Sequence, residues 1–317
     1  MLAALLKDFG ALPGVTVETM LGREFLASGE TPPAGVVVHE VEYGGEEATF
    51  RRLAAAADRT LVVAPECDDV LPERLRWLEE AGGRSLGSTV GAARLAGDKL
   101  RLAGQLRERG VPTPFTVVWP TEPPSYPTVC KPRHGAGSQA TFLVRDEDEL
   151  RRAAEQARAE GWDGDLIVQP FVPGEPASVA FLIGPARRLA LPAVSQRLTA
   201  DGRFHYRGGR LPLTPESAER AAALAARAVD AVEGLRGYVG VDVVLGPTAD
   251  GDSVMEINPR MTTSYVGLRA LARFNLAGAL LAVAEELAPP SWDWGTEQAC
   301  FTADGRLSGP EAVLCVL

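Results

Sequence analysis

The sequence is poor in the residues that build disulfide frameworks, zinc sites and membrane spans. Its 317 residues include four cysteines, widely spaced and without a CxxC pair, and three histidines without metal-ligand spacing. Neither a disulfide scaffold nor a zinc site is therefore expected, and we predict free thiols in a cytoplasmic protein. No apolar run approaches the roughly 18 residues that a membrane helix needs. The apolar start is interrupted by Lys7 and Asp8 without a basic segment before it, which favours a helix of the mature protein over a signal peptide.

Positive charge is also scarce relative to negative charge. The chain has 32 Lys and Arg against 42 Asp and Glu, which gives a net charge of −10. A general nucleic-acid binder or a binder of anionic membranes would need a basic field, so neither class is expected. A local basic pocket for a small molecule is compatible with this balance.

The length and the 46% apolar content predict a folded protein of two or three domains. Apolar runs at residues 36–38 and 60–64 have the length of buried parallel strands. Two helical patterns follow them, at residues 50–57 and 75–78, so residues 1–96 are expected to form an open parallel sheet with helices. Glu66 lies in the loop after the second run, where it either contacts a substrate amine or belongs to a solvated turn.

A pair of short strands near residue 250 carries the strongest chemical signal. Glu256 and Asn258 are two residues apart in the run 253–258, so their side chains should share one face. Residues 240–245 form the partner strand of a predicted hairpin, which brings Asp242 near them. Carboxylate and amide oxygens suit a hard cation such as Mg2+. The alternative is an ordinary hairpin with solvent-facing polar residues.

Two lysines precede features that favour phosphate binding. Lys131 ends an apolar strand and is followed by the glycine-containing loop 132–139, which could wrap phosphate oxygens, although the spacing is not that of a P-loop. Lys99 follows Asp98 at the start of a predicted helix, and the helix pattern alone favours a structural interpretation, with Asp98 at the helix start and Lys99 in a solvated first turn. Strands at 116–119 and 140–144 and a helix at 145–160 are expected around the loop.

Two further segments could contact ligands. The strand 166–170 runs into a connector fixed by Pro170 and Pro173, in which Phe171 and Val172 either line a slot for a purine or belong to a plain linker. The arginines in the excursion 197–210 either grip carboxylates or lie in a solvated turn. Helices at 217–234 and 268–287 and a last strand at 312–316 complete the expected elements.

In this order, the segments resemble the ATP-grasp family of carboxylate–amine ligases. The resemblance implies an α/β (α+β) fold with three parts: an N-terminal open parallel-sheet domain (1–96), a small lid (97–165) and an antiparallel-sheet catalytic domain (166–317). It also implies ATP and Mg2+, or Mn2+, as cofactors. The implied ATP-binding residues are Lys99, Lys131, Gln169, Phe171, Val172 and Glu175. The implied metal ligands are Asp242, Glu256 and Asn258, and the implied catalytic arginines are Arg260, Arg210 and Arg197.

Residues 64–71, 206–209 and 257–268 further resemble the ligases that join L-glutamate to tyramine in methanofuran biosynthesis. This likeness implies amide formation between L-glutamate and tyramine or tyrosine through an acyl phosphate, with small molecules as partners and no nucleic acid or membrane. A ligase for another amino acid or dipeptide and a nucleotide-binding module without turnover are the alternatives. The sequence leaves open whether the chain is a monomer or a homodimer.

Overall fold

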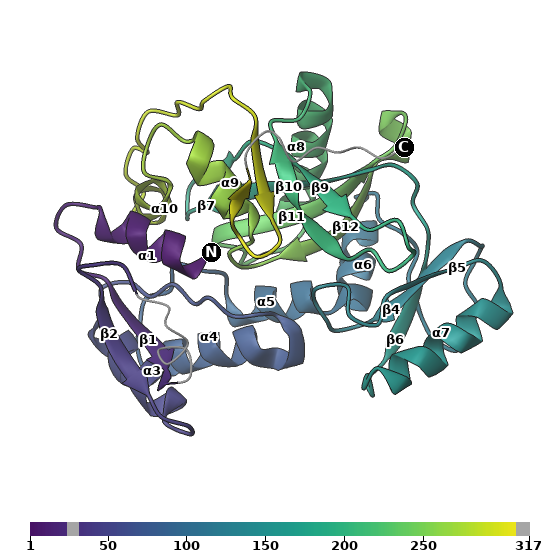
Figure 1. Cartoon of the computed structure of the whole chain (residues 1–317), viewed down its shortest axis with the longest axis horizontal. Coiled ribbons are helices and arrows are strands. Elements are labelled where there is room, and N and C mark those ends of the chain that lie inside the picture. The colour runs from purple at the N-terminus through teal and green to yellow at the C-terminus, as the bar shows by residue number, and fades with distance from the viewer. Residues whose placement is uncertain (24–31, 309–317) are drawn as a thin grey trace.

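A computed structural model describes residues 1–23 and 32–308 of the chain. Its three parts are a large antiparallel sheet with helices on both faces, a small α/β lid beside it, and an N-terminal unit on the other side (Figure 1). The strand expected at residues 312–316 lies outside the described residues. Among the helices of the described ranges, none combines the length and apolar character of a membrane span.

The large sheet contains eight strands within the described residues, all paired antiparallel. Their order is β12-β11-β7-β9-β10-β13-β14, and β8 pairs with β7. The strands are β7 (Glu175–Ile183), β8 (Arg188–Ala190), β9 (Val194–Leu198), β10 (Tyr206–Leu211), β11 (Gly237–Leu245), β12 (Ser253–Asn258), β13 (Ala299–Thr302) and β14 (Leu307–Ser308).

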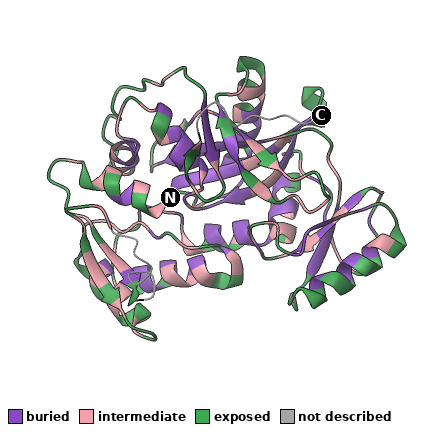
Figure 2. Ribbon diagram, in the orientation of Figure 1, coloured by how far each residue is buried: buried purple, intermediate pink, exposed green. Residues whose placement is uncertain are grey.

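Helices cover both faces of this sheet because alternate residues of its central strands are apolar on both sides. One face packs on α8 (Pro215–Asp230), α5 (Val90–Gly97) and α6 (Lys99–Glu108), and Val179 and Val241 are at its centre. The other face packs on α9 (Ser264–Leu271), α10 (Leu276–Ala284) and α1 (Leu2–Gly10), around Phe301. Figure 2 shows the buried residues concentrated in this sheet.

The helix expected at residues 268–287 is two helices, and this correction has a local cause. Residues 272–275 leave the helical conformation, and Asn275 caps α10 by accepting a hydrogen bond from the Gly278 N–H (2.9 Å). The Asn275 amide also donates to the Asp8 carbonyl (2.7 Å), so the break lets α10 pack against α1. Asparagine is a preferred N-cap residue, whereas the apolar pattern on both sides of it is continuous.

The lid (residues 116–170) is a four-stranded antiparallel sheet with one helix on it. Its strand order is β3 (Val117–Val118), β6 (Leu166–Pro170), β4 (Thr128–Pro132) and β5 (Phe142–Val144). The helix α7 (Glu147–Ala159) packs its alanines and Leu150 onto this sheet, capped by Asp146. The expected boundaries 97 and 165 are therefore wrong. Helix α6 belongs with the large sheet, because its Leu102 and Leu106 lie in the core of that sheet. Strand β6 belongs to the lid, because its Val168 lies in the lid core.

The N-terminal unit contains a parallel pair of strands within its described residues, β1 (Glu18–Gly22) and β2 (Val37–Val41). It also contains α3 (Glu46–Ala56), the short η1 (Cys67–Asp69) and α4 (Val70–Glu80). The strand expected at residues 60–64 is replaced by a single parallel bridge between Thr60 and Ser85. Val62 is nevertheless buried between α3 and α4, since an apolar run can satisfy burial without forming a ladder.

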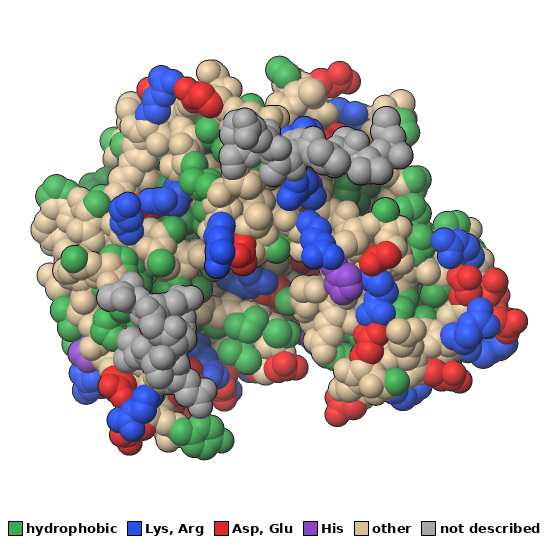
Figure 3. Space-filling view, in the orientation of Figure 1, with side chains coloured by type: hydrophobic (Ala, Val, Ile, Leu, Met, Phe, Trp, Pro, Cys, Tyr) green, Lys and Arg blue, Asp and Glu red, His purple; other side chains and the backbone are tan. Residues whose placement is uncertain are grey.

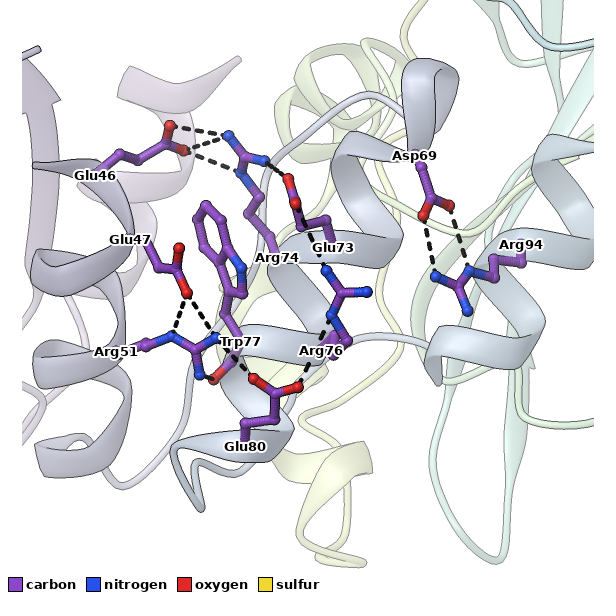
Figure 4. Close-up of polar contacts among 10 residues, drawn as sticks. All are labelled: Glu46, Glu47, Arg51, Asp69, Glu73, Arg74, Arg76, Trp77, Glu80 and Arg94. Atoms are coloured by element: carbon purple, nitrogen blue, oxygen red, sulfur yellow. Dashed lines mark hydrogen bonds and ion pairs between the residues drawn. The ribbon is translucent and has the colours of Figure 1, made fainter. Parts of the chain in front are cut away.

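Ion pairs connect α3 and α4 on the surface of this unit. Figure 4 shows Arg74 of α4 reaching Glu46 of α3 (2.8 Å) while its guanidinium lies 4.4 Å from the Trp77 ring centre. Arg51 likewise joins Glu80 (2.7 Å). Such exposed pairs contribute little individually. Figure 3 shows acidic and basic side chains interspersed over the face that it draws, in keeping with a chain whose charge is spread rather than concentrated.

Candidate active site

A cavity of about 570 Å3 lies between the lid and the large sheet. Its walls come from β4 and the glycine loop after it, the hinge segment (residues 169–174), and strands β7, β9, β11 and β12. Nine of the twelve residues expected to act as a site line this cavity: Lys99, Lys131, Gln169, Phe171, Val172, Asp242, Glu256, Asn258 and Arg260. The fold therefore brings together segments that are as much as 161 positions apart in the sequence, from residue 99 to residue 260.

The acidic corner of the cavity is formed by Asp242, Glu256 and Asn258. Asp242 is directly opposite Glu256 in the β11–β12 pairing, so both carboxylates are on one face, as expected. The Asn258 amide donates to Asp242 Oδ2 (3.1 Å), and the Gln196 amide donates to Asp242 Oδ1 (2.9 Å). Burial, together with the nearby charge of Glu256, raises the pKa of Asp242 to about 7.

This donor set fits a hard divalent cation. Two half-buried carboxylates face each other across adjacent strands, and no Lys or Arg lies within 4 Å of the Asp242 carboxylate among the described residues. No group of three His, Cys, Asp or Glu side chains forms a metal site elsewhere in these ranges. Two carboxylates and an amide are oxygen donors of the kind that Mg2+ prefers, with further positions left for water or phosphate oxygens.

Two lysines, Lys99 and Lys131, bring positive charge close to the acidic corner. Lys99 Nζ lies 3.4 Å from Glu256 Oε2 and donates to the Gly135 carbonyl (2.7 Å). Lys131 is half-buried, and its pKa falls to about 8 because desolvation and the charge of Lys99 outweigh the attraction of Glu256. Burial by itself would raise the pKa of Glu256, but Lys99, Lys131 and Arg260 lower it on balance. The cavity thus holds an ionised carboxylate among cations.

The position of Lys99 follows from its place at a helix start. Asp98 caps α6 by accepting from the Arg101 N–H (3.1 Å) and also binds Arg133 at the end of β4 through both carboxylate oxygens (2.7 and 2.9 Å). Asp98 is therefore structural, and its cap and ion pair hold the next residue, Lys99, against the glycine loop. The structural role of Asp98 thus places the Lys99 ammonium group at the cavity.

The glycine loop is held in place by the hairpin loop between β9 and β10. Gly137 and Ser138 adopt left-handed backbone conformations (φ 70° and 61°), which turn the loop over the cavity. The Ser138 hydroxyl donates to the Phe204 carbonyl (2.7 Å). The Phe204 ring stacks near that of Phe171 in the hinge segment, with centroids 6.0 Å apart and planes at 23°. These rings form an apolar end of the cavity.

Gln169, which also lines the cavity, has a buried acceptor without a hydrogen-bond partner among the described residues. Its amide nitrogen donates to Thr116 Oγ1 (2.7 Å), and the Thr116 hydroxyl donates in turn to the Pro114 carbonyl (3.0 Å). Because the Thr116 proton is used in this way, the Gln169 group that faces Thr116 must be the NH2. Gln169 Oε1 is buried and lacks a partner within the described residues. A buried acceptor without a donor is costly unless a ligand supplies one.

Arg260 lies at the edge of the cavity and is held by Glu66 of the N-terminal unit. Both Glu66 oxygens accept from it, one from Nε and one from Nη2 (3.1 Å for Nη2–Oε1). Glu66 is buried, so it belongs to this ion pair rather than to a solvated turn. The sequence signal for this contact was an acidic residue in a strand-end loop, but its partner, 194 positions away, could not be inferred.

Three expected site residues lie away from the cavity. Val194, Gln196 and Leu198 line it from β9, so strand alternation turns Arg197 to the opposite face. Arg210 pairs with Ser195 and shares that opposite face. Glu175 begins β7 as an exposed residue that does not line the cavity. The expected contacts of these three side chains with substrate or ribose therefore have no counterpart in this geometry.

Comparison with known proteins agrees with this architecture. Residues 96–264 match the model of the ATP-grasp domain, and residues 17–93 match that of the pre ATP-grasp 3 domain. The tyramine–L-glutamate ligase of Methanocaldococcus jannaschii is 30% identical over 212 residues, which cover 67% of this chain and 58% of that protein. The D-alanine–D-alanine ligase of Stutzerimonas stutzeri is 32% identical over 205 residues, which cover 58% of this chain and 62% of that protein.

A solved structure extends the likeness to three dimensions. An ATP-grasp superfamily protein from Archaeoglobus fulgidus superposes with a TM-score of 0.64 at 25% identity, covering 84% of this chain and 74% of that one. The chain therefore spans more of this structure than of the two curated relatives, of which it spans about three fifths.

Proposed function

The chain belongs to the ATP-grasp family, and on this premise we propose that it is a ligase that joins an amino-acid carboxylate to an amine while cleaving ATP to ADP and phosphate. The observation that carries the proposal is the arrangement of Lys99, Lys131 and Arg260 around the acidic corner of one cavity. Cations and a cation-binding carboxylate pair together provide what a polyphosphate needs. The cavity volume of about 570 Å3 is within the range of small-ligand sites.

The proposed reaction proceeds in two steps. A substrate carboxylate oxygen attacks the γ-phosphorus, the bond between that phosphorus and the β,γ-bridging oxygen breaks, and ADP leaves with its electron pair. The nitrogen of the amine then attacks the acyl carbon of the acyl phosphate, inorganic phosphate leaves, and the nitrogen loses a proton. No covalent protein nucleophile is required, so catalysis depends on positioning and on stabilising charge.

The residues of the cavity have distinct proposed roles in these steps. Lys99 and Lys131 hold the phosphates of ATP, and Arg260 stabilises the phosphoryl group in transfer. Asp242, Glu256 and Asn258 would hold Mg2+, or Mn2+ in its place. The bound ion would neutralise charge on the phosphates. The lid and the β9–β10 loop enclose the glycine loop and so limit the access of water to the acyl phosphate.

The adenine base is proposed to occupy the apolar end of the cavity. Gln169 Oε1 would accept a hydrogen bond from the exocyclic amino group, which would supply the donor that this oxygen lacks among the described residues. Phe171 and Val172 of the hinge segment line the same end and would contact the flat face of the base. Glu175 has no proposed role at the ribose, because it lies outside the cavity.

L-glutamate as the carboxylate and tyramine or tyrosine as the amine are the proposed substrates. This choice is supported by the likeness to tyramine–L-glutamate ligases, and it would place the chain in the synthesis of a methanofuran-type cofactor. The likeness to D-alanine–D-alanine ligases favours one alternative, a ligase that joins two amino acids.

The test measures ADP release from ATP and Mg2+ with L-glutamate, with and without tyramine or tyrosine, and then the mass of the product. A glutamyl-tyramine or glutamyl-tyrosine mass is the expected result. If ADP forms only with other amino-acid pairs, such as D-alanine, the ligase proposal stands and the substrate assignment falls. If no pair of carboxylate and amine substrates raises ADP release above the rate with ATP alone, the ligase proposal itself is contradicted.

A further inference from the structure

We propose that Glu66 is a positioning residue of the reaction, which acts by holding Arg260 beside the phosphates rather than on the acidic corner. The inference rests on the proposed ligase function and extends it to the N-terminal unit. Glu66 does not line the cavity, but it fixes a side chain that does. The N-terminal unit would thus set the geometry of phosphoryl transfer in addition to any part in substrate binding.

The hydrogen bonds of Arg260 divide its donors between the protein and the cavity. A guanidinium has five N–H groups in a rigid plane. Glu66 takes those on Nε and on one side of Nη2, and the Met261 carbonyl takes one on Nη1 (3.2 Å). One N–H on each of Nη1 and Nη2 remains for a ligand. Because the plane is fixed at two points, these remaining donors have a fixed direction.

The backbone that carries Glu66 is itself held on both sides. Asp68 and Asp69 both adopt left-handed conformations (φ 54° and 56°), which cost energy for residues other than glycine. Asp69 is anchored by Arg94 of α5 (3.0 Å), as Figure 4 shows. The end of α5 packs closely on Glu66, since a Cβ on Gly97 would lie 3.2 Å from the Glu66 carbonyl oxygen. This turn is fixed more firmly than a connecting loop requires.

Electrostatics explains why Arg260 needs such a partner. Among the described residues, Glu66 is the one carboxylate within 4 Å of its guanidinium. Asp242 and Glu256 are the next negative charges that act on it. Without Glu66, Arg260 would be drawn toward these two carboxylates, where it would compete with a cation. Glu66 therefore keeps the acidic corner available and the arginine directed at the phosphates.

A purely structural tie between two parts of the chain is the alternative, and the protein contains a matched example of one. Asp8 of α1 binds Arg269 of α9 through both carboxylate oxygens (2.7 and 2.5 Å). Neither residue lines the cavity. The pairs are comparable in burial, with side-chain exposures of 5% and 21% for Glu66 and Arg260 and of 13% and 25% for Asp8 and Arg269. Asp8→Asn is therefore the control for Glu66→Gln.

The kinetic test uses the full chain with ATP, Mg2+, L-glutamate and tyramine, or whichever pair proves active. Glu66→Gln is expected to lower kcat about tenfold and to raise KM for ATP by no more than about threefold, since Arg260 is then displaced toward the acidic corner. Glu66→Asp should recover part of kcat, and Asp8→Asn should keep kcat within about twofold. The double variant Glu66→Gln/Arg260→Ala should have the same kcat as Arg260→Ala alone, because both changes remove the same interaction.

The inference would be overturned if Glu66→Gln and Asp8→Asn lost kcat equally, or if Glu66→Gln kept the kcat of the wild type. It would also be overturned if kcat in the double variant fell by the product of the two single losses. Calorimetry with ATP and AMP gives a readout that is independent of turnover. Glu66→Gln should leave AMP affinity unchanged and weaken ATP binding up to about threefold, because Arg260 then lies nearer the acidic corner and competes with its cation. Equal weakening of both nucleotides would also overturn it. A wild type that binds ATP without ligating any pair contradicts the ligase proposal, while this nucleotide comparison still tests Glu66.

Discussion

Ionisable side chains in the cavity behave according to their neighbours more than to their residue type. Asp242 and Glu256 face each other across two strands, yet the pKa of Asp242 rises to about 7 while that of Glu256 is lowered. The difference arises because Lys99 and Lys131 act on Glu256, whereas amide groups rather than cations contact Asp242. A divalent cation between them would remove this asymmetry by stabilising both in the ionised form.

Glu256→Ala tests the cation assignment. We expect ADP formation to fall about 100-fold or more, because a lost metal ligand removes several kcal/mol of stabilisation in phosphoryl transfer. Excess Mg2+ should restore only part of the rate, as the remaining ligands bind it more weakly. Steady-state ADP release at several Mg2+ concentrations is the measurement. Glu175→Ala, which alters an exposed carboxylate outside the cavity, is the control, and unchanged turnover in Glu256→Ala would remove the assignment.

Gln169→Met tests the adenine acceptor. Methionine has a similar volume but offers no oxygen, so ATP should bind roughly fivefold more weakly, in line with about 1 kcal/mol for one net hydrogen bond. GTP carries an acceptor in place of the amino group and should not lose affinity. The measurement is the ratio of the dissociation constants of ATP and GTP, each obtained by calorimetry. Gln105→Met, which removes a side-chain hydrogen bond to the Ala231 carbonyl far from the cavity, should leave the ratio unchanged.

Lys131 predicts a pH dependence with a definite sign. Its pKa is lowered to about 8, so the free enzyme carries this charge at pH 7 and loses it as the pH rises through 8. We therefore expect kcat/KM for ATP to decline between pH 7 and pH 9, since this ratio reports ionisations of the free enzyme. Lys131→Arg keeps its charge throughout, and its profile should lack this decline. Identical slopes in the two proteins would contradict the role of Lys131.

Between elements, the contact that matters most for the cavity joins the β9–β10 loop to the lid. Arg203 in this loop binds Glu160 at the end of α7 through both oxygens (2.9 and 2.8 Å), and its guanidinium lies 4.2 Å from the Phe142 ring centre. The Leu143 N–H donates to the Gly202 carbonyl (2.8 Å). A loop of the large sheet thus holds the lid over the glycine loop.

Arg203→Met should loosen this contact and admit water to the site. We expect a few-fold rise in ADP released per amide formed, because water then competes with the amine for the acyl phosphate. Parallel assays of ADP and product give the ratio. Arg151→Met, which breaks exposed ion pairs within α7 and leaves the β9–β10 contact intact, should keep the wild-type ratio. A ratio unchanged in Arg203→Met would show that the lid closes without this contact.

Across the molecule, polar contacts join the N-terminal helix α1 to α9 of the large-sheet unit. Asp8 of α1 receives hydrogen bonds from Tyr265 (2.7 Å) and Arg269 of α9. Glu66 makes a similar contact to Arg260 from the same N-terminal region. Figure 1 shows α1 against the helices of the large sheet and β1, β2 and α3 further out. The N-terminal region therefore attaches to the large-sheet unit at several places, which include Asp8, the Arg59–Glu285 ion pair and Glu66, and the contact of Glu66 reaches the cavity.

Asp8→Asn separates the stabilising role of these contacts from a catalytic one. We expect a loss of about 1–3 kcal/mol in the free energy of unfolding, as for hydrogen bonds to charged groups, and a lower Tm. Thermal unfolding of the wild type and the variant measures it. Asp58→Asn, at an exposed residue in a loose pair with Arg84, should not change Tm. An Asp8→Asn protein as stable as the wild type would mean that apolar packing alone holds α1.

The amino-acid order was sufficient to predict most helices, the β11–β12 hairpin and the acidic corner, because these depend on local periodicity. It was wrong for residues 197–210, where an irregular excursion was expected and parts of strands β9 and β10 are found. Glu256 and Asn258 share a face through strand alternation, and a short hairpin makes Asp242 their neighbour. The helix starts at Asp98, Asp146 and Thr214 carry their own caps. The break at Asn275 and the missing strand at 60–64 were not predictable, because in both places a contact with another segment decided between two locally acceptable conformations.

The folded chain was needed to sort the charged residues into those that meet the cavity and those that do not. Arg197, Arg210 and Arg260 are alike in sequence terms, yet only Arg260 faces the cavity, because strand pairing and its register decide which side of the sheet each residue occupies. The Glu66–Arg260 pair and the unpaired oxygen of Gln169 likewise depend on segments far apart in the chain. Sequence patterns report short-range geometry, whereas burial, charge pairing and orphaned hydrogen-bond groups are properties of the packed whole.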